Sequence, residues 1–174
     1  MFTGRSEAVA GSVLIHALLV MAVLTLLGIT AITTTSIDLH ISGNYRLGWE
    51  VFYLGEAGAE HGREALRVLN AGSTNPQSFT DELTALTGSN GLLDGYEEGT
   101  DDVPLLGPTP LGAGTYTVYL TNDLLEGASN PIDNNGKVTL TAVASGPQGS
   151  QAVVESTVAL FPFFPLPAAI TLLG

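Results

Sequence analysis

The chain has 174 residues, room for about one domain and an appendage, and 45% of them are apolar, enough for a core of ordinary size. Five Lys and Arg against 17 Asp and Glu give a formal net charge of -12. Nucleic-acid binding is therefore not expected, because phosphate contacts need clustered cations. The lack of cysteine excludes disulfides, thiolate nucleophiles and thiolate zinc sites.

The N-terminal part of the sequence contains a membrane-length apolar segment. No charged residue occurs between Glu7 and Asp38, and residues 12–32 form an apolar run of about 21 residues, roughly 31 Å of helix. Arg5 precedes this run and nearly all of the acids follow it, so the positive-inside rule predicts a cytoplasmic N-terminus and an exported remainder.

Apolar residues continue at helical spacing beyond this run, at Ile37, Ile41, Tyr45, Phe52, Ala59, Leu66 and Leu69. Two Glu–Arg pairs spaced three residues apart support a helix here, Glu60–Arg63 and Glu64–Arg67. The sequence therefore predicts one long helix over about 12–69. Three glycines lie near one face of this helix, Gly55, Gly58 and Gly62. They either let another helix approach closely or only weaken this one.

The region after the long helix is predicted to be rich in strands. A Ser-x-x-Asp start at Ser78 predicts a short helix over 78–87, and the Gly- and Pro-rich residues 88–114 indicate irregular loop. Alternating apolar residues then predict three strands, at 115–120, 137–143 and 151–160. These strands are expected to form an antiparallel sheet covered by the amphipathic half of the helix.

The order of these features, with several short segments, resembles type IV pilins and, more narrowly, the N-terminal region of PilX-type minor pilins over about 11–69. The segments are Gly11 with Ser12-Val13-Leu14-Ile15, Leu26-Leu27-Gly28, Ile41-Ser42-Gly43-Asn44-Tyr45-Arg46, Phe52-Tyr53, and Glu56-Ala57-Gly58-Ala59-Glu60. The resemblance implies that prepilin peptidase cleaves after Gly11, leaving Ser12 as the mature N-terminus, and it implies assembly roles for Arg46 and Glu56.

The sequence departs from most pilins at two places. Its leader carries Ala8-Val9-Ala10 before the cleavage glycine, where most pilin leaders carry Lys or Arg. His16 occupies the fifth mature position, where most pilins have a Glu that neutralises the N-terminal amine of a neighbouring subunit. Its loss implies a place at the filament tip, and the competing interpretation gives His16 only a local hydrogen bond.

The predicted fold class is α+β and pilin-like, with a long N-terminal helix, transmembrane in its first half, packed on a small antiparallel sheet. The sequence divides into a prepilin leader at 1–11, the transmembrane and assembly half of the helix at 12–37, its amphipathic half at 38–70, a β-rich headgroup at 71–160, and an apolar, proline-rich tail at 161–174 that is a candidate linker to a further region.

Two acidic clusters are candidate calcium sites, because both gather oxygen ligands. The first contains Asp133 and Asn135, with Asp123 expected across the sheet edge, and it lacks the distal Glu of an EF-hand loop, so a turn is favoured. The second is favoured as a solvated loop and comprises Asp94, Glu97, Glu98, Asp101 and Asp102. We therefore expect no cofactor, with calcium as the alternative.

No catalytic motif occurs in the sequence. His40 and His61 lie on the helix without a His-Glu-x-x-His arrangement, and neither a Gly-x-Ser-x-Gly motif nor a glycine-rich phosphate loop is present. The sequence predicts no enzyme. It favours a minor pilin that primes or caps a type IV pilus and whose partners are prepilin peptidase, other pilins and, before assembly, the lipid bilayer of the cytoplasmic membrane.

Two alternatives stay open at this point. A pseudopilin of a type II secretion system would have the same N-terminal features. An exported acidic binding module, anchored or secreted by a signal peptide cleaved near Ala31, would have a similar apolar run. The pattern argues against the second, because a signal peptide normally ends in a break and the helical spacing here continues.

Overall fold

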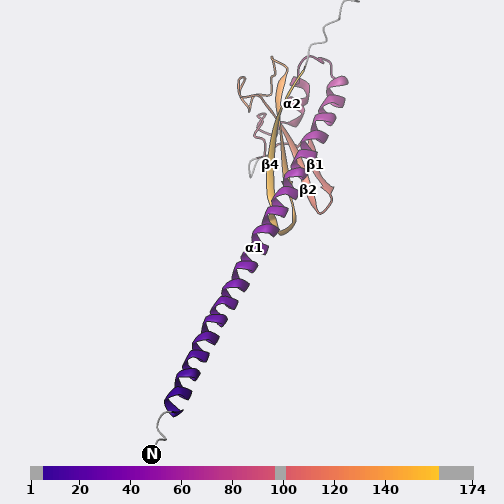
Figure 1. Ribbon diagram of the computed structural model, residues 1–174. Coiled ribbons are helices and arrows are strands. Elements are labelled where there is room, and N and C mark those ends of the chain that lie inside the picture. The colour runs from indigo at the N-terminus through magenta and orange to yellow at the C-terminus, as the bar shows by residue number, and fades with distance from the viewer. Residues whose placement is uncertain (1–5, 97–100, 161–174) are drawn as a thin grey trace, which may run out of the picture. The chain divides into compact units, whose positions relative to one another are not determined.

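The computed structural model describes residues 6–96 and 101–160 (Figure 1). The elements, in chain order, are α1 (Ser6–Ala71), α2 (Thr80–Leu86), β1 (Leu106–Leu111), β2 (Gly114–Asn122), β3 (Lys137–Ser145), the 3-10 turn η1 (Pro147–Gly149) and β4 (Gln151–Ala159). The chain forms two compact units, Met1–Arg46 and Leu47–Gly174. The predicted tail at 161–174 lies outside the described residues, as do residues 1–5 of the predicted leader.

The long helix is confirmed, and α1 contains no proline to interrupt it. It extends two residues beyond the predicted end, and the Gly72 N–H then closes the last turn on the Leu69 carbonyl at 3.0 Å. Asn70 is buried there, and its amide donates to the Ser78 carbonyl at 3.1 Å and to Glu82 Oε1 at 3.2 Å. The end of α1 is thereby tied to the segment that leads into α2.

The four strands form one antiparallel sheet in the order β1-β2-β3-β4, so β1 and β4 are its edges. The three predicted strands are confirmed. The prediction of loop over 88–114 is wrong for β1, whose sequence Leu-Gly-Pro-Thr-Pro-Leu has the composition of a loop. Its prolines are tolerated because β1 is an edge strand whose pairing with β2 is irregular between Leu106 and Thr109.

One face of the sheet and the second half of α1 form the core of the Leu47–Gly174 unit, as the sequence predicted. The sheet contributes Tyr116, Val118, Leu120, Val138, Leu140, Ala142 and Ala144, and α1 contributes Val51, Leu54, Ala59 and Leu66. The predicted stripe is wrong at Phe52 and Leu69, which are 39% and 52% exposed. Phe52 contacts the ring of Trp49 instead, with centroids 6.0 Å apart.

The short helix is confirmed over Thr80–Leu86, but its predicted Ser-x-x-Asp cap is wrong. The Ser78 hydroxyl donates to the Asp133 carbonyl at 2.7 Å, and the Asp81 carboxylate accepts from two hydroxyls upstream of the helix. The Phe79 N–H is satisfied by Asp133 Oδ2 at 2.7 Å. A partner more than 50 residues away in the sequence has therefore replaced the local cap.

Candidate functional site

The apolar half of α1 is the first candidate functional surface. Within the Met1–Arg46 unit every described side chain from Val13 to Arg46 is exposed. By length and composition it is the one described helix that meets the requirements for crossing a membrane. An uncovered apolar surface of this extent needs lipid or other apolar helices around it.

Threonine hydroxyls in this segment are satisfied within the helix. Thr25 donates to the Met21 carbonyl at 2.7 Å and Thr30 to the Leu26 carbonyl at 2.9 Å. The same i to i−4 pattern is repeated at Thr33, Thr34 and Thr35. The hydroxyls therefore impose no unsatisfied donor on an apolar environment. Sequence reasoning missed this feature, although the spacing of threonines in a helix would have revealed it.

The predicted processing and assembly residues are distributed along α1. Gly11 and Ser12 lie within its helical backbone, and His16 is exposed in the first unit. Arg46 is also exposed and is the last residue of that unit. Glu56 belongs to the second unit, where it lines a groove of about 530 Å³ between α1 and β4. The structure thus gives the five residues no common site.

On α1, the glycines Gly55, Gly58 and Gly62 face the sheet rather than another helix. A Cβ atom at Gly55 would lie 2.8 Å from Val154 Cγ2, and one at Gly62 would lie 2.8 Å from Val118 Cγ1. Such distances are shorter than carbon–carbon contacts allow, so only glycine permits this approach. The sequence analysis expected either close packing of helices or a weakened helix, and the structure shows instead a close approach of α1 to the headgroup's own sheet.

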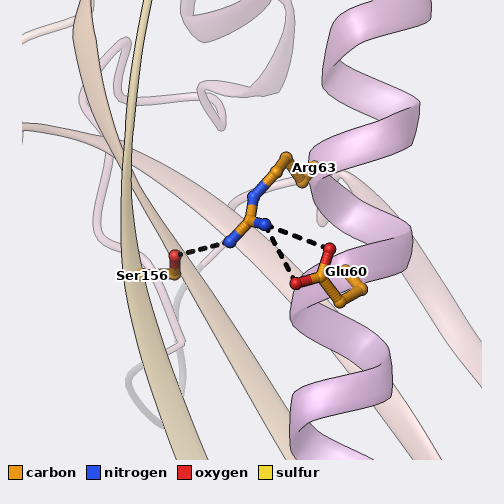
Figure 2. A network of polar contacts seen from close by, with 3 residues as sticks. All are labelled: Glu60, Arg63 and Ser156. Atoms are coloured by element: carbon orange, nitrogen blue, oxygen red, sulfur yellow. Dashed lines mark hydrogen bonds and ion pairs between the residues drawn. The ribbon is translucent and has the colours of Figure 1, made fainter.

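A polar link joins α1 to β4 beside this contact. The Arg63 guanidinium donates to both Glu60 oxygens, at 2.9 and 3.1 Å, and to the Ser156 hydroxyl at 3.3 Å (Figure 2). The predicted Glu60–Arg63 ion pair is therefore confirmed, and Figure 2 shows its guanidinium turned toward the strand. The pair is exposed, so it contributes at most about 1 kcal/mol of stability.

The second predicted ion pair, Glu64–Arg67, is also confirmed, at 2.7 Å. The hydrogen bond and charge of the Arg67 guanidinium lower the pKa of the Glu64 carboxyl, and the carboxylate in turn raises the pKa of Arg67. Both side chains face solvent along the helix, where such pairs support the helix locally.

An aromatic cluster on α1 is a feature that the sequence analysis did not single out. Trp49 and Tyr53 stack with ring centroids 5.7 Å apart, and Phe52 meets both rings edge-on. Tyr53 borders a pocket of about 270 Å³ that is also lined by Leu111, the last residue of β1, and by Pro147 of η1. The pocket is mostly apolar and lies where α1 enters the unit.

The first predicted acidic cluster is organised as a turn. Asp133 is only 3% exposed, and its Oδ1 accepts the backbone N–H groups of Asn135 at 3.0 Å and Gly136 at 2.8 Å. The Asn135 amide donates to Asp123 Oδ2 at 3.0 Å, so the predicted proximity of these three residues is confirmed. The carboxylate oxygens of Asp123 and Asp133 accept protein donors, which favours the turn interpretation over a calcium site.

The second acidic cluster is partly described. Carboxylate oxygens of Asp94, Asp101 and Asp102 lie within 4.8 Å of one another, whereas the predicted members Glu97 and Glu98 lie outside the described residues. Asp102 Oδ2 accepts the N–H of Asp94 at 2.7 Å. The hydroxyl and N–H of Ser89 bind Asp101 and lower its pKa. These bonds hold the loop together.

The remaining candidate, His61, takes part in a structural contact. Its Nδ1 lies 2.7 Å from the hydroxyl of Tyr116, whose ring is buried under α1.

The apolar segment, the glycine contacts and the aromatic cluster all lie on α1, and the comparisons with known proteins concern the same helix. Residues 10–60 match the family model described as PilX N-terminal. The match confirms the resemblance to PilX-type pilins, which are structural and non-enzymatic proteins. It ends at residue 60, so α2 and the sheet lie outside it. No curated protein and no solved structure matches the chain.

The PilX N-terminal match contains both the exposed apolar segment and the first part of α1 that packs on the sheet. The segment therefore has the composition and the family resemblance of a membrane-anchored pilin helix.

Proposed function

We propose that this chain is a minor pilin that primes or caps a type IV pilus. In this proposal α1 anchors the chain in the cytoplasmic membrane with the N-terminus inside and the acidic headgroup exported. Prepilin peptidase then cleaves between Gly11 and Ser12, and the chain joins other pilins. The observation that carries the proposal is that one unbroken helix contains an uncharged, membrane-length segment, the PilX N-terminal match and the core contacts of the headgroup.

The physical argument concerns what surrounds the apolar segment. Its side chains are uncovered in the chain itself, and lipid covers them before assembly. When the subunit leaves the bilayer, only the apolar helices of other pilins offer an equivalent environment. Anchoring and assembly thus use the same surface at different times.

Three residues of α1 receive assembly roles in the proposal. His16, at the fifth mature position, cannot neutralise a neighbouring amine as a carboxylate does, which favours a place at the tip. Arg46 and Glu56 are exposed and available to adjacent subunits, as their PilX-like segments imply. The proposal assigns no cofactor to the chain.

Two alternatives differ from this proposal in measurable ways. A type II secretion pseudopilin would use the same helix but would co-fractionate with secretion components rather than with pili. An exported acidic binding module would lose the apolar run by cleavage near Ala31. The unbroken helix through Ala31 disfavours that second alternative, since a signal peptide normally ends in a helix break.

The decisive experiment is N-terminal sequencing of the chain from membranes and from sheared surface filaments. We expect Ser12 as the first residue in both fractions. Replacing Gly11→Trp should leave a longer precursor in the membrane and none in filaments. Gly28→Trp is the matched control, because it puts the same side chain on the same exposed apolar helix and should leave processing intact. A start near Ala31, or normal processing of the Gly11 variant, contradicts the proposal.

A further inference from the structure

The loop between β2 and β3 presents two leucines to solvent. Leu124 is 89% exposed and Leu125 is 84% exposed, more than any other large apolar side chain among the described residues, including those of the membrane-length segment. We call these two residues the leucine pair. Single exposed leucines are common, but two adjacent ones held fully in water lose the stabilisation that burial provides and indicate an interaction site.

A hydrogen-bond network fixes the backbone on both sides of the leucine pair. The side-chain amide of the buried Asn122 donates to the carbonyls of Asn130 at 3.0 Å and Ile132 at 2.9 Å, and its Oδ1 accepts the backbone N–H of Asp123. Asp123 Oδ1 then accepts the Glu126 N–H at 3.1 Å. The loop is therefore ordered before any partner arrives, so binding does not have to order it.

The helix does not cover this loop. Within the Leu47–Gly174 unit, Val51 and Leu54 of α1 lie against Gly146 and Gly114, at the starting end of β2. Further along α1, Gly62 lies against Val118, so the helix runs toward the end of β2. The leucine pair follows Asn122, the last residue of β2, and its high exposure shows that α1 leaves it uncovered. It is thus available to a partner without displacing the core.

The charge around the leucine pair restricts the partner. Six of the 17 acids precede residue 68. The other 11 lie in residues 68–174, where Lys137 is the single cation. Two of these acids, Asp123 and Glu126, flank the pair directly. A second copy of this acidic chain or an anionic bilayer would be repelled, whereas a basic surface would be attracted.

We propose that the leucine pair docks into an apolar pocket, bordered by Lys or Arg side chains, on a second and different protein. The two leucines fill the pocket and the surrounding carboxylates face its basic border. This inference goes beyond the proposed function, which concerns α1. It gives the headgroup a partner contact of its own in the loop that follows β2.

The experiment is photocrosslinking in the cells that produce the chain, with p-benzoylphenylalanine at position 124 of the full chain. We expect one adduct with another protein, whose crosslinked peptide contains apolar residues flanked by Lys or Arg. Leu125→Asp in the same chain should reduce the adduct at least tenfold, whereas Leu125→Met should preserve it. The same crosslinker at Leu111, a half-exposed leucine at the other end of β2, should not give this adduct.

Other outcomes overturn the inference. No adduct, an adduct with a second copy or with lipid, or a partner peptide without cations would each do so. Circular dichroism of the Leu125 variants establishes that the headgroup is folded, as expected for a residue that contributes little to the core. Incorporation into filaments is measured in the same cells, so if the chain with the crosslinker at position 124 and an unchanged Leu125 assembles but gives no adduct, the docking site is rejected and the proposed function stands.

Discussion

Gly58 of α1 lies against the ring of Tyr116 of β2, and a Cβ atom at position 58 would come within 2.9 Å of Tyr116 Cδ2. One turn further along α1, His61 Nδ1 lies 2.7 Å from the hydroxyl of the same tyrosine. The ring is thus held by the helix backbone at its edge and by a side chain at its tip. This arrangement fixes how closely α1 packs on the sheet, and it depends on the missing side chain at position 58.

Gly58→Ala should therefore destabilise the headgroup. Crowding of the Tyr116 ring is expected to cost about 1–3 kcal/mol, more than the helix gains from alanine. Gly48→Ala is the matched control, because that glycine lies on the same helix with open space around it and should stabilise by about 0.5–1 kcal/mol. Denaturant unfolding of the full chain in detergent, followed by circular dichroism, measures both. Equal effects at the two positions would contradict the packing argument.

Asp133→Asn should loosen two segments at once. The Asp133 carboxylate accepts the N–H of Phe79 before α2 and the N–H of Gly136 before β3. An amide offers one acceptor oxygen in place of two, so one buried N–H loses its partner, at a cost of about 1–3 kcal/mol. Amide hydrogen exchange should accelerate at Phe79 or Gly136. Asp38→Asn, at an exposed position on α1, serves as the control and should change neither rate.

Ser89→Ala should raise the pKa of Asp101. The Ser89 hydroxyl and N–H stabilise the Asp101 carboxylate, which lowers its pKa below the ordinary value. The associated stability is therefore present above the unfolded pKa of about 3.9 and is lost as the pH falls through the lower folded pKa. Carboxyl NMR titration measures the shift. Asp81, whose pKa is lowered by Thr74 and Ser73, should titrate unchanged in this variant.

His16→Glu tests the tip position. A carboxylate there gains a neighbouring amine as partner, worth about 4 kcal/mol at 4 Å and an effective dielectric of 20 before desolvation is subtracted. Immunogold labelling should then show the variant along filaments, with an unchanged headgroup spectrum. His40→Glu makes the same change on the same helix outside the apolar run and should keep the wild-type distribution. Wild-type chain found along the shaft would refute the tip assignment.

The parts of the fold that follow local periodicity were predictable. The unbroken α1 needed only the absence of proline and a helical apolar pattern, and three strands followed from alternation at residues such as Val118 and Leu140. β1 was missed because Pro108 and Pro110 are typical of loops, and only the position of the strand at the sheet edge makes them acceptable.

The parts that depend on distant residues were not predictable. Sequence spacing put Phe52 in the core, whereas the sheet selects the glycine-lined face of α1 and leaves Phe52 to its aromatic neighbours. The local cap expected at Ser78 gave way to Asp133, which no short-range pattern links to α2. The same holds for the exposure of Leu124, because composition alone does not distinguish a buried leucine from one held in water.

The threonine hydroxyls of α1 have a thermodynamic consequence. Thr25, Thr30, Thr33, Thr34 and Thr35 carry their acceptors with them on the same helix. Moving these five residues from one apolar medium to another therefore exchanges none of their side-chain hydrogen bonds. Their part of the transfer free energy depends on how well the new neighbours fill the space that lipid chains vacate.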